Sequence, residues 1–88
     1  MLSYTIGMQF IWKPEKNELL KAERNICFEE IIEAITKGGL IGTHLYSGIK
    51  RAHKKQIVLI VKIREEIWKV PVTPRKNLVF MHTAYPVT

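Results

Sequence analysis

The side chains best suited to proton transfer are His53, His82 and Tyr85. The densest positive stretch of the chain surrounds the first of them and carries Lys50, Arg51, Lys54 and Lys55. Cationic neighbours favour the neutral imidazole, which is the form that accepts a proton. A positive loop beside a sheet also suits phosphate contacts. The alternative is a solvated loop whose histidine has no chemical role.

The last strand expected from the sequence carries His82 and ends at Tyr85. Alternation along a strand places His82 on the same face as Phe80 and opposite Tyr85. Tyr85 could donate a proton to a leaving group, and Arg75 and Lys76 supply cations just before this strand. Structural roles stay open, since His82 could be a core or edge histidine and Tyr85 a packed core aromatic.

The remaining candidates are expected to be structural. We interpret His44 as a structural histidine and Cys27 as an inert residue at a helix start. Trp12 and Trp68 fit core aromatics better than base-stacking platforms. The three histidines show no metal-ligand spacing, and one cysteine excludes an internal disulfide or a cysteine-based zinc site. We therefore expect no metal and no cofactor.

Length and charge define the class of protein. The chain has 88 residues, 47% of them apolar, which fits one domain with a packed core. Its net charge of +6 is uneven, because residues 1–33 hold four basic residues and six glutamates, whereas residues 34–88 hold ten basic residues and two glutamates. This favours a polyanionic partner, nucleic acid first and an acidic protein second, over a basic surface kept for solubility.

The apolar runs and the cysteine content of the sequence indicate where in the cell the protein is expected. No apolar run approaches the ~18 residues of a membrane span, so we expect no membrane partner. A single cysteine fits a reducing environment, and we expect a cytoplasmic protein.

The first half of the chain is expected to supply one strand and two helices. Alternating apolar residues predict a half-buried strand over residues 3–12, weakened at Gly7. A helix should begin at Pro14 and end near Asn25 in a left-handed cap. Cys27 and Glu30 have the spacing of a capping box for a second helix. That helix should bury Phe28, Ile31, Ile32 and Ile35 and stop at Gly38-Gly39.

The second half is expected to supply four strands. They cover residues 40–46, 56–63, 67–72 and 78–85, with turns at residues 64–66 and 73–77. The run QIVLIVKI should be central, and Pro71 should put the end of the third of these strands at an edge or bulge. The order strand, helix, helix and four strands predicts an α+β domain over residues 1–88, with two N-terminal helices on one face of an antiparallel sheet.

Several segments together resemble the BrnT-like toxins of bacterial type II toxin–antitoxin systems. The opening carries Phe10-Ile11-Trp12, Lys16-Asn17, Arg24-Asn25-Ile26 and Phe28-Glu29-Glu30. The strand segments are Lys55 to Val61, Val70-Pro71-Val72 and Phe80 to Pro86. The resemblance implies a RelE-like fold, a small ribonuclease and an antitoxin that blocks it. It begins at Met8, so residues 1–7 are expected to be an N-terminal extension without function.

The chemistry implied by this resemblance is metal-independent cleavage of RNA, in which the 2′-OH attacks the adjacent phosphate. Such a reaction needs a base, an acid for the leaving 5′-oxygen and cations for the phosphorane. The candidate catalytic residues are His53, His82 and Tyr85. The candidate RNA-binding residues are Lys50, Arg51, Lys54, Lys55, Arg75 and Lys76. An antitoxin should cover this surface with acidic groups, and it could also join copies of the toxin into an oligomer.

The sequence also departs from the family pattern. Lys13 replaces an acidic residue, Asn25 a glycine and Cys27 a serine or threonine. Relatives continue with a basic C-terminal segment, where this sequence ends at Thr88. One alternative is therefore a non-catalytic module that binds nucleic acid or protein and has lost activity with that segment. Another is a purely structural partner whose basic face docks an acidic antitoxin.

Overall fold

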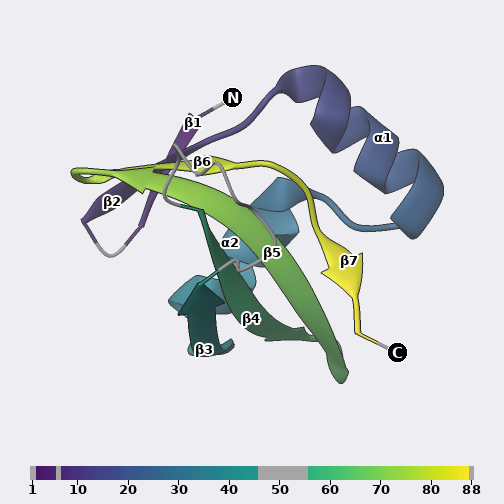
Figure 1. The fold of residues 1–88 in the computed structure, drawn as a ribbon. Coiled ribbons are helices and arrows are strands. Elements are labelled where there is room, and N and C mark those ends of the chain that lie inside the picture. The colour runs from purple at the N-terminus through teal and green to yellow at the C-terminus, as the bar shows by residue number, and fades with distance from the viewer. Residues whose placement is uncertain (1, 6, 46–55, 88) are drawn as a thin grey trace.

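Seven strands and two helices form the described part of the chain (Figure 1). The structure is a computed structural model that describes residues 2–5, 7–45 and 56–87. The elements are β1 (Leu2–Thr5), β2 (Met8–Ile11), α1 (Pro14–Arg24), α2 (Phe28–Thr36), β3 (Leu40–Leu45), β4 (Ile57–Ile63), β5 (Glu66–Arg75), β6 (Leu78–Met81) and β7 (Tyr85–Pro86). Neither of these helices is long and apolar enough to cross a membrane.

The sheet has the strand order β1-β2-β6-β5-β4-β3, and β7 also pairs with β5. All pairings are antiparallel except that of β2 with β6, where Phe10 lies opposite Val79 and Ile11 opposite Phe80. The α+β class with a mostly antiparallel sheet is thus confirmed, whereas the parallel pair was not expected. It arises because both helices and β3 to β5 lie between β2 and β6, which is the long crossover that parallel strands require.

Both helices begin and end close to the expected residues. Pro14 occupies the first turn of α1, and Asn25 ends the helix in the left-handed conformation (φ 55°, ψ 39°). Helix α2 buries Phe28, Ile31, Ile32 and Ile35, as its periodicity predicts. Gly38 follows it with φ 93°, a conformation that glycine adopts without strain.

The core lies between the helices and one face of the sheet. Leu20 of α1 and the four apolar residues of α2 join it, together with residues from alternate positions of β4, β5 and β6. Trp12 and Trp68 are each 4% exposed, which confirms the prediction that they are core aromatics. The ring of Trp12 lies 5.6 Å from that of Phe28, which joins the end of β2 to the start of α2.

The N-terminal strand prediction is wrong in one respect, because the segment is a hairpin and not one strand. Thr5 pairs with Met8, and Gly7 has φ 72°. This left-handed conformation is favourable for glycine and costly for other residues, so the chain reverses there. The alternation that suggested one strand therefore belongs to two antiparallel strands.

Strand β5 is longer than predicted and does not end near Pro71. The Pro71 carbonyl accepts a hydrogen bond from the His82 backbone N–H (N···O 3.1 Å), so its nitrogen faces the same side. On that side β6 has ended at Met81 and β7 has not yet begun at Tyr85. The missing N–H of Pro71 therefore falls where no neighbouring strand needs a donor, so β5 can continue past this proline.

This interruption also divides the predicted last strand, since residues 82–84 separate β6 from β7. Arg24 of α1 holds this segment by donating from Nη1 to the Ala84 carbonyl (2.7 Å).

The predicted turns are also tighter than expected. Ile63 pairs with Glu66, and Arg75 pairs with Leu78, so each connection has two residues.

The capping box predicted at the start of α2 is not present. Cys27 occupies the N-cap position but makes no side-chain cap hydrogen bond. Asn17 of α1 replaces it, because its Oδ1 accepts the Phe28 N–H at 2.7 Å. Its Nδ2 also donates to Glu29 Oε1 at 2.8 Å. Glu30 instead forms an ion pair with Arg64 at 2.9 Å. The cap is thus tertiary and joins the two helices.

Candidate functional site

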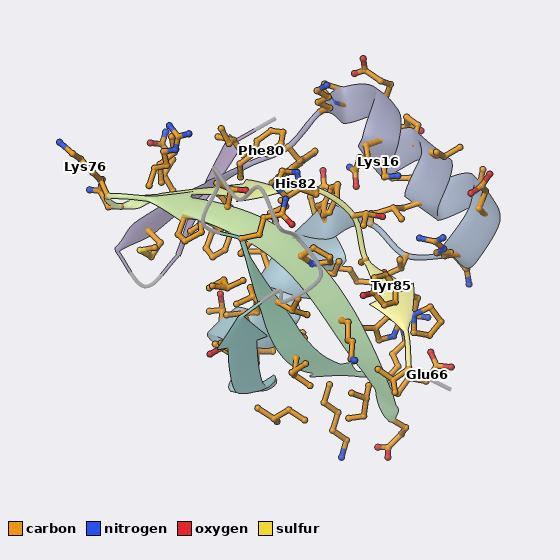
Figure 2. All side chains as sticks on the ribbon, viewed as in Figure 1. Lys16, Glu66, Lys76, Phe80, His82 and Tyr85 are labelled. Atoms are coloured by element: carbon orange, nitrogen blue, oxygen red, sulfur yellow. The ribbon has the colours of Figure 1, made fainter. Side chains whose placement is uncertain are left out.

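The outer face of the sheet, opposite the core, carries the candidate site. Phe80 of β6 lies between Ile11 of β2 and Thr73 of β5 in the strand register. His82 is two residues further along and therefore shares the face of Phe80, as predicted. Figure 2 shows the two side chains together at the end of β6, near the start of α1.

His82 is held by neighbours on three sides. Its Nε2 lies 2.6 Å from Thr73 Oγ1, and its ring contacts that of Phe80 edge to face, with 4.9 Å between centroids. Its backbone N–H is held by Pro71. Because Thr73 occupies Nε2, Nδ1 is the ring nitrogen left for a ligand. Partial burial lowers the pKa of His82, which favours the neutral imidazole.

Two hollows meet at His82 and Phe80. The larger one has a volume of about 400 Å³ and is lined by Ile11, Gln56, Thr73, Arg75, Leu78, Phe80 and His82. The smaller one has a volume of about 230 Å³ and is lined by Lys13, Lys16, Phe80, Met81 and His82. We call them the apolar hollow and the cationic hollow. His82 and Phe80 line both hollows, so a ligand that extends from one hollow to the other passes the imidazole.

The cations at these hollows are available to a ligand. Lys13, Lys16 and Arg75 form no ion pair or hydrogen bond with another described side chain, unlike Lys21, Lys37 and Arg64, which pair with glutamates. Lys13 and Lys16 lie at the start of α1, where the helix dipole adds positive potential. The cationic hollow is therefore suited to a phosphate beside a neutral histidine.

The structure brings only some of the predicted site residues together. Arg75 and His82 line the apolar hollow, whereas Lys76 is exposed at the tip of the β5–β6 hairpin. Tyr85 lies on β7 opposite Lys69 and lines neither hollow. In Figure 2 it lies further along the sheet, toward Glu66. The remaining predicted residues, Lys50, Arg51, His53, Lys54 and Lys55, lie outside the described residues.

Sequence reasoning missed Lys13 and Lys16 as site residues. The available signal was that Lys13 stands where the family pattern has an acidic residue. That substitution could be recognised as part of a site only once the parallel pairing of β2 with β6 was known. This pairing brings the residues after β2, including Lys13, beside the residues after β6, including His82. Phe80 and Thr73 were missed because a strand residue shows no function until its cross-strand neighbours are known.

The sole cysteine lies away from these hollows, at the start of α2. Burial raises the pKa of the Cys27 thiol, and the hydrogen bond from Cys27 to Glu29 acts in the same direction. A raised pKa disfavours the thiolate, which is the reactive form. This agrees with the interpretation of Cys27 as an inert residue.

Comparison of the chain with protein-family models, with curated proteins and with solved structures gave no significant match. The resemblance to BrnT-like toxins therefore rests on the sequence motifs alone.

Proposed function

We propose that the protein is a BrnT-like toxin with a RelE-like fold, a metal-independent endoribonuclease that a cognate antitoxin neutralises. The observation that carries this proposal is the position of His82, a histidine with a lowered pKa between a cationic hollow and an apolar one. The motifs of the opening segment support the same function independently. RNA offers both of the ligand types that these hollows fit, a phosphate and a base.

The proposed chemistry uses His82 as the general base. Nδ1 takes the proton of the 2′-OH, whose oxygen attacks the adjacent phosphorus. Lys13 and Lys16 hold the phosphate oxygens and stabilise the charge of the phosphorane. The leaving 5′-oxygen takes a proton from a second group. Lys16 of the same hollow is one candidate for this role and His53 is another from the sequence, whereas Tyr85 lines neither hollow. The products are a 2′,3′-cyclic phosphate and a 5′-hydroxyl.

The antitoxin in this proposal is a protein with acidic side chains. Lys13, Lys16 and Arg75 are unpaired within the described residues, so an acidic segment laid over them would gain charge pairs and exclude RNA. The expectation that Lys50 to Lys55 form part of the covered surface stays a prediction from the sequence. Binding of an acidic partner that abolishes RNA binding would support this arrangement.

The decisive experiment incubates the purified protein with end-labelled RNA in the presence of a chelator. We expect cleavage with 2′,3′-cyclic phosphate ends, and we expect His82→Gln to lose about a hundredfold or more in rate. Lys62→Gln, which removes an exposed cation of β4 outside both hollows, is the matched control and should cleave like the parent. RNA binding without cleavage would reject the enzyme and favour the non-catalytic module of the same fold.

A further inference from the structure

The apolar hollow has the composition of a base-binding pocket. Ile11, Leu78 and Phe80 form its apolar surface, and all three are half-buried. Its polar lining residues are Gln56, Thr73, Arg75 and His82. A cavity of about 400 Å³ with a mostly apolar surface and several polar side chains is typical of a small-molecule site.

We propose that this hollow selects a guanine base in the RNA, and this inference rests on the proposed function. The contact between two side chains supports it, because the rings of Phe80 and His82 lie 4.9 Å apart between centroids. A base stacked on Phe80 would leave its own ribose and phosphate beside His82. The cationic hollow on the other side of His82 would then receive that phosphate.

Phe80 is the stacking surface in this arrangement. The His82 ring contacts it edge to face at 4.9 Å, and Ile11 and Thr73 flank it on the neighbouring strands. These neighbours fix the ring, and a pre-positioned aromatic ring loses little freedom when a base stacks on it. Stacking by itself tolerates every base, so the selectivity must come from the polar groups.

Arg75 supplies the selectivity for guanine. Its guanidinium only donates hydrogen bonds, and it has no partner among the described side chains. Guanine presents two acceptors, O6 and N7, side by side, which match the guanidinium fork. Adenine presents an amino group in place of O6, so one donor of Arg75 would face another donor. Gln56 can donate and accept at the same rim.

The test measures binding separately from cleavage. It uses fluorescein-labelled 2′-O-methyl uridine octamers, which lack the attacking hydroxyl, with a single guanine, adenine or cytosine at one position. Fluorescence anisotropy gives the Kd for each octamer. We expect the guanine octamer to bind the parent about tenfold more tightly than the adenine octamer, as one bidentate contact provides.

Four variants assign this preference. Arg75→Ala and Arg75→Lys should both bind guanine and adenine equally, because lysine keeps the charge but not the fork. Phe80→Leu should weaken all octamers alike. Lys76→Ala is the matched control, since this neighbouring cation does not line the hollow. It should weaken all octamers slightly and keep the preference for guanine. Circular dichroism of each variant confirms folding.

The outcomes distinguish this inference from the proposed function. Octamers that bind without a base preference, or a preference that survives in Arg75→Ala, would overturn the guanine pocket and leave the ribonuclease intact. Octamers that do not bind at all would overturn both. If an acidic antitoxin binds through Phe80 and Arg75 while octamer affinity is unchanged in their variants, the hollow is a protein-docking site.

Discussion

The Nε2 of His82 lies 2.6 Å from the hydroxyl oxygen of Thr73, across the β5–β6 pair. This hydrogen bond fixes the imidazole ring and leaves Nδ1 for a ligand, so Thr73 is a positioning residue. We expect Thr73→Val to lower kcat by roughly two- to tenfold with little change in KM. The variant loses the hydrogen bond that orients the imidazole, and one such bond contributes about 1 kcal/mol.

Thr73→Ser keeps the hydroxyl and is the matched control, which should restore kcat. Long-range ¹H–¹⁵N NMR provides a readout independent of activity, since it reports the tautomer of His82. An unchanged tautomer population in Thr73→Val would contradict the positioning role.

The lowered pKa of His82 predicts how stability depends on pH. In the unfolded chain its pKa should return to about 6.5, so between the folded value and 6.5 the unfolded state binds more protons. The free energy of unfolding should therefore rise with pH through this window. The contribution is complete above 6.5 and is lost as the pH falls through the folded value.

Urea unfolding at a series of pH values measures this contribution, and His82→Gln is the comparison. The two proteins share every other titratable group, so the difference between the two curves isolates His82. Lys13 and Lys16 line a hollow with His82, but burial is the cause of its lowered pKa. Parallel curves for the parent and the variant would show that His82 has no altered pKa.

The cap that Asn17 provides for α2 is the second specific contact with a measurable consequence. Asn17 is 3% exposed and serves both the Phe28 N–H and the Glu29 carboxylate. Asn17→Ala leaves the buried N–H without its partner, which should cost about 1–3 kcal/mol of unfolding free energy.

Asn17→Asp separates the two contacts. It keeps the acceptor for Phe28 but places a carboxylate beside Glu29, so it should lie between the parent and Asn17→Ala. Desolvation is the largest influence and acts to raise the pKa of Glu29, but the hydrogen bonds from Asn17, from the Glu29 backbone N–H and from Cys27 together outweigh it and hold that pKa below its usual value. The Glu29 pKa, followed by NMR, should therefore rise in both variants. Equal stability of Asn17→Ala and the parent would exclude the capping role.

The parts predictable from the sequence were those set by local pattern. The apolar face of α2 and the left-handed end of α1 at Asn25 depend on residues close in the chain, and both were confirmed. The cap of α2 was not predictable, because Asn17 lies 11 residues before Phe28 and on another helix.

The candidate site was predictable only in part, for a related reason. That His82 shares a face with Phe80 followed from alternation along the last strand, and Arg75 was named as a cation just before that strand. The cationic hollow required the parallel pairing of β2 with β6, and long-range register leaves no local signal when both strands are short. The role predicted for Tyr85 assumed that one strand continues from residue 78 to 85, whereas the interruption at residues 82–84 separates Tyr85 from His82.

The β4–β5 turn offers a stability prediction that leaves the site untouched. Arg64 and Glu65 are its two residues, and both are left-handed, with φ of 51° and 70°. Such a two-residue hairpin favours glycine and asparagine, and a side chain in this conformation costs about 1–2 kcal/mol. Glu65→Gly should therefore raise the free energy of unfolding by about 1 kcal/mol, because the strain is relieved and part of the gain is offset by unfolded-state entropy.

Glu65 is the better position to change, since Arg64 also pairs with Glu30 and donates to the Asn25 carbonyl. Glu66→Gly is the matched control. It removes the same side chain one residue later, at the first residue of β5, where glycine should destabilise by roughly 0.5 kcal/mol. Chemical denaturation of the three proteins measures both effects. A loss of stability in Glu65→Gly as large as that in Glu66→Gly would show that the turn is not left-handed at Glu65.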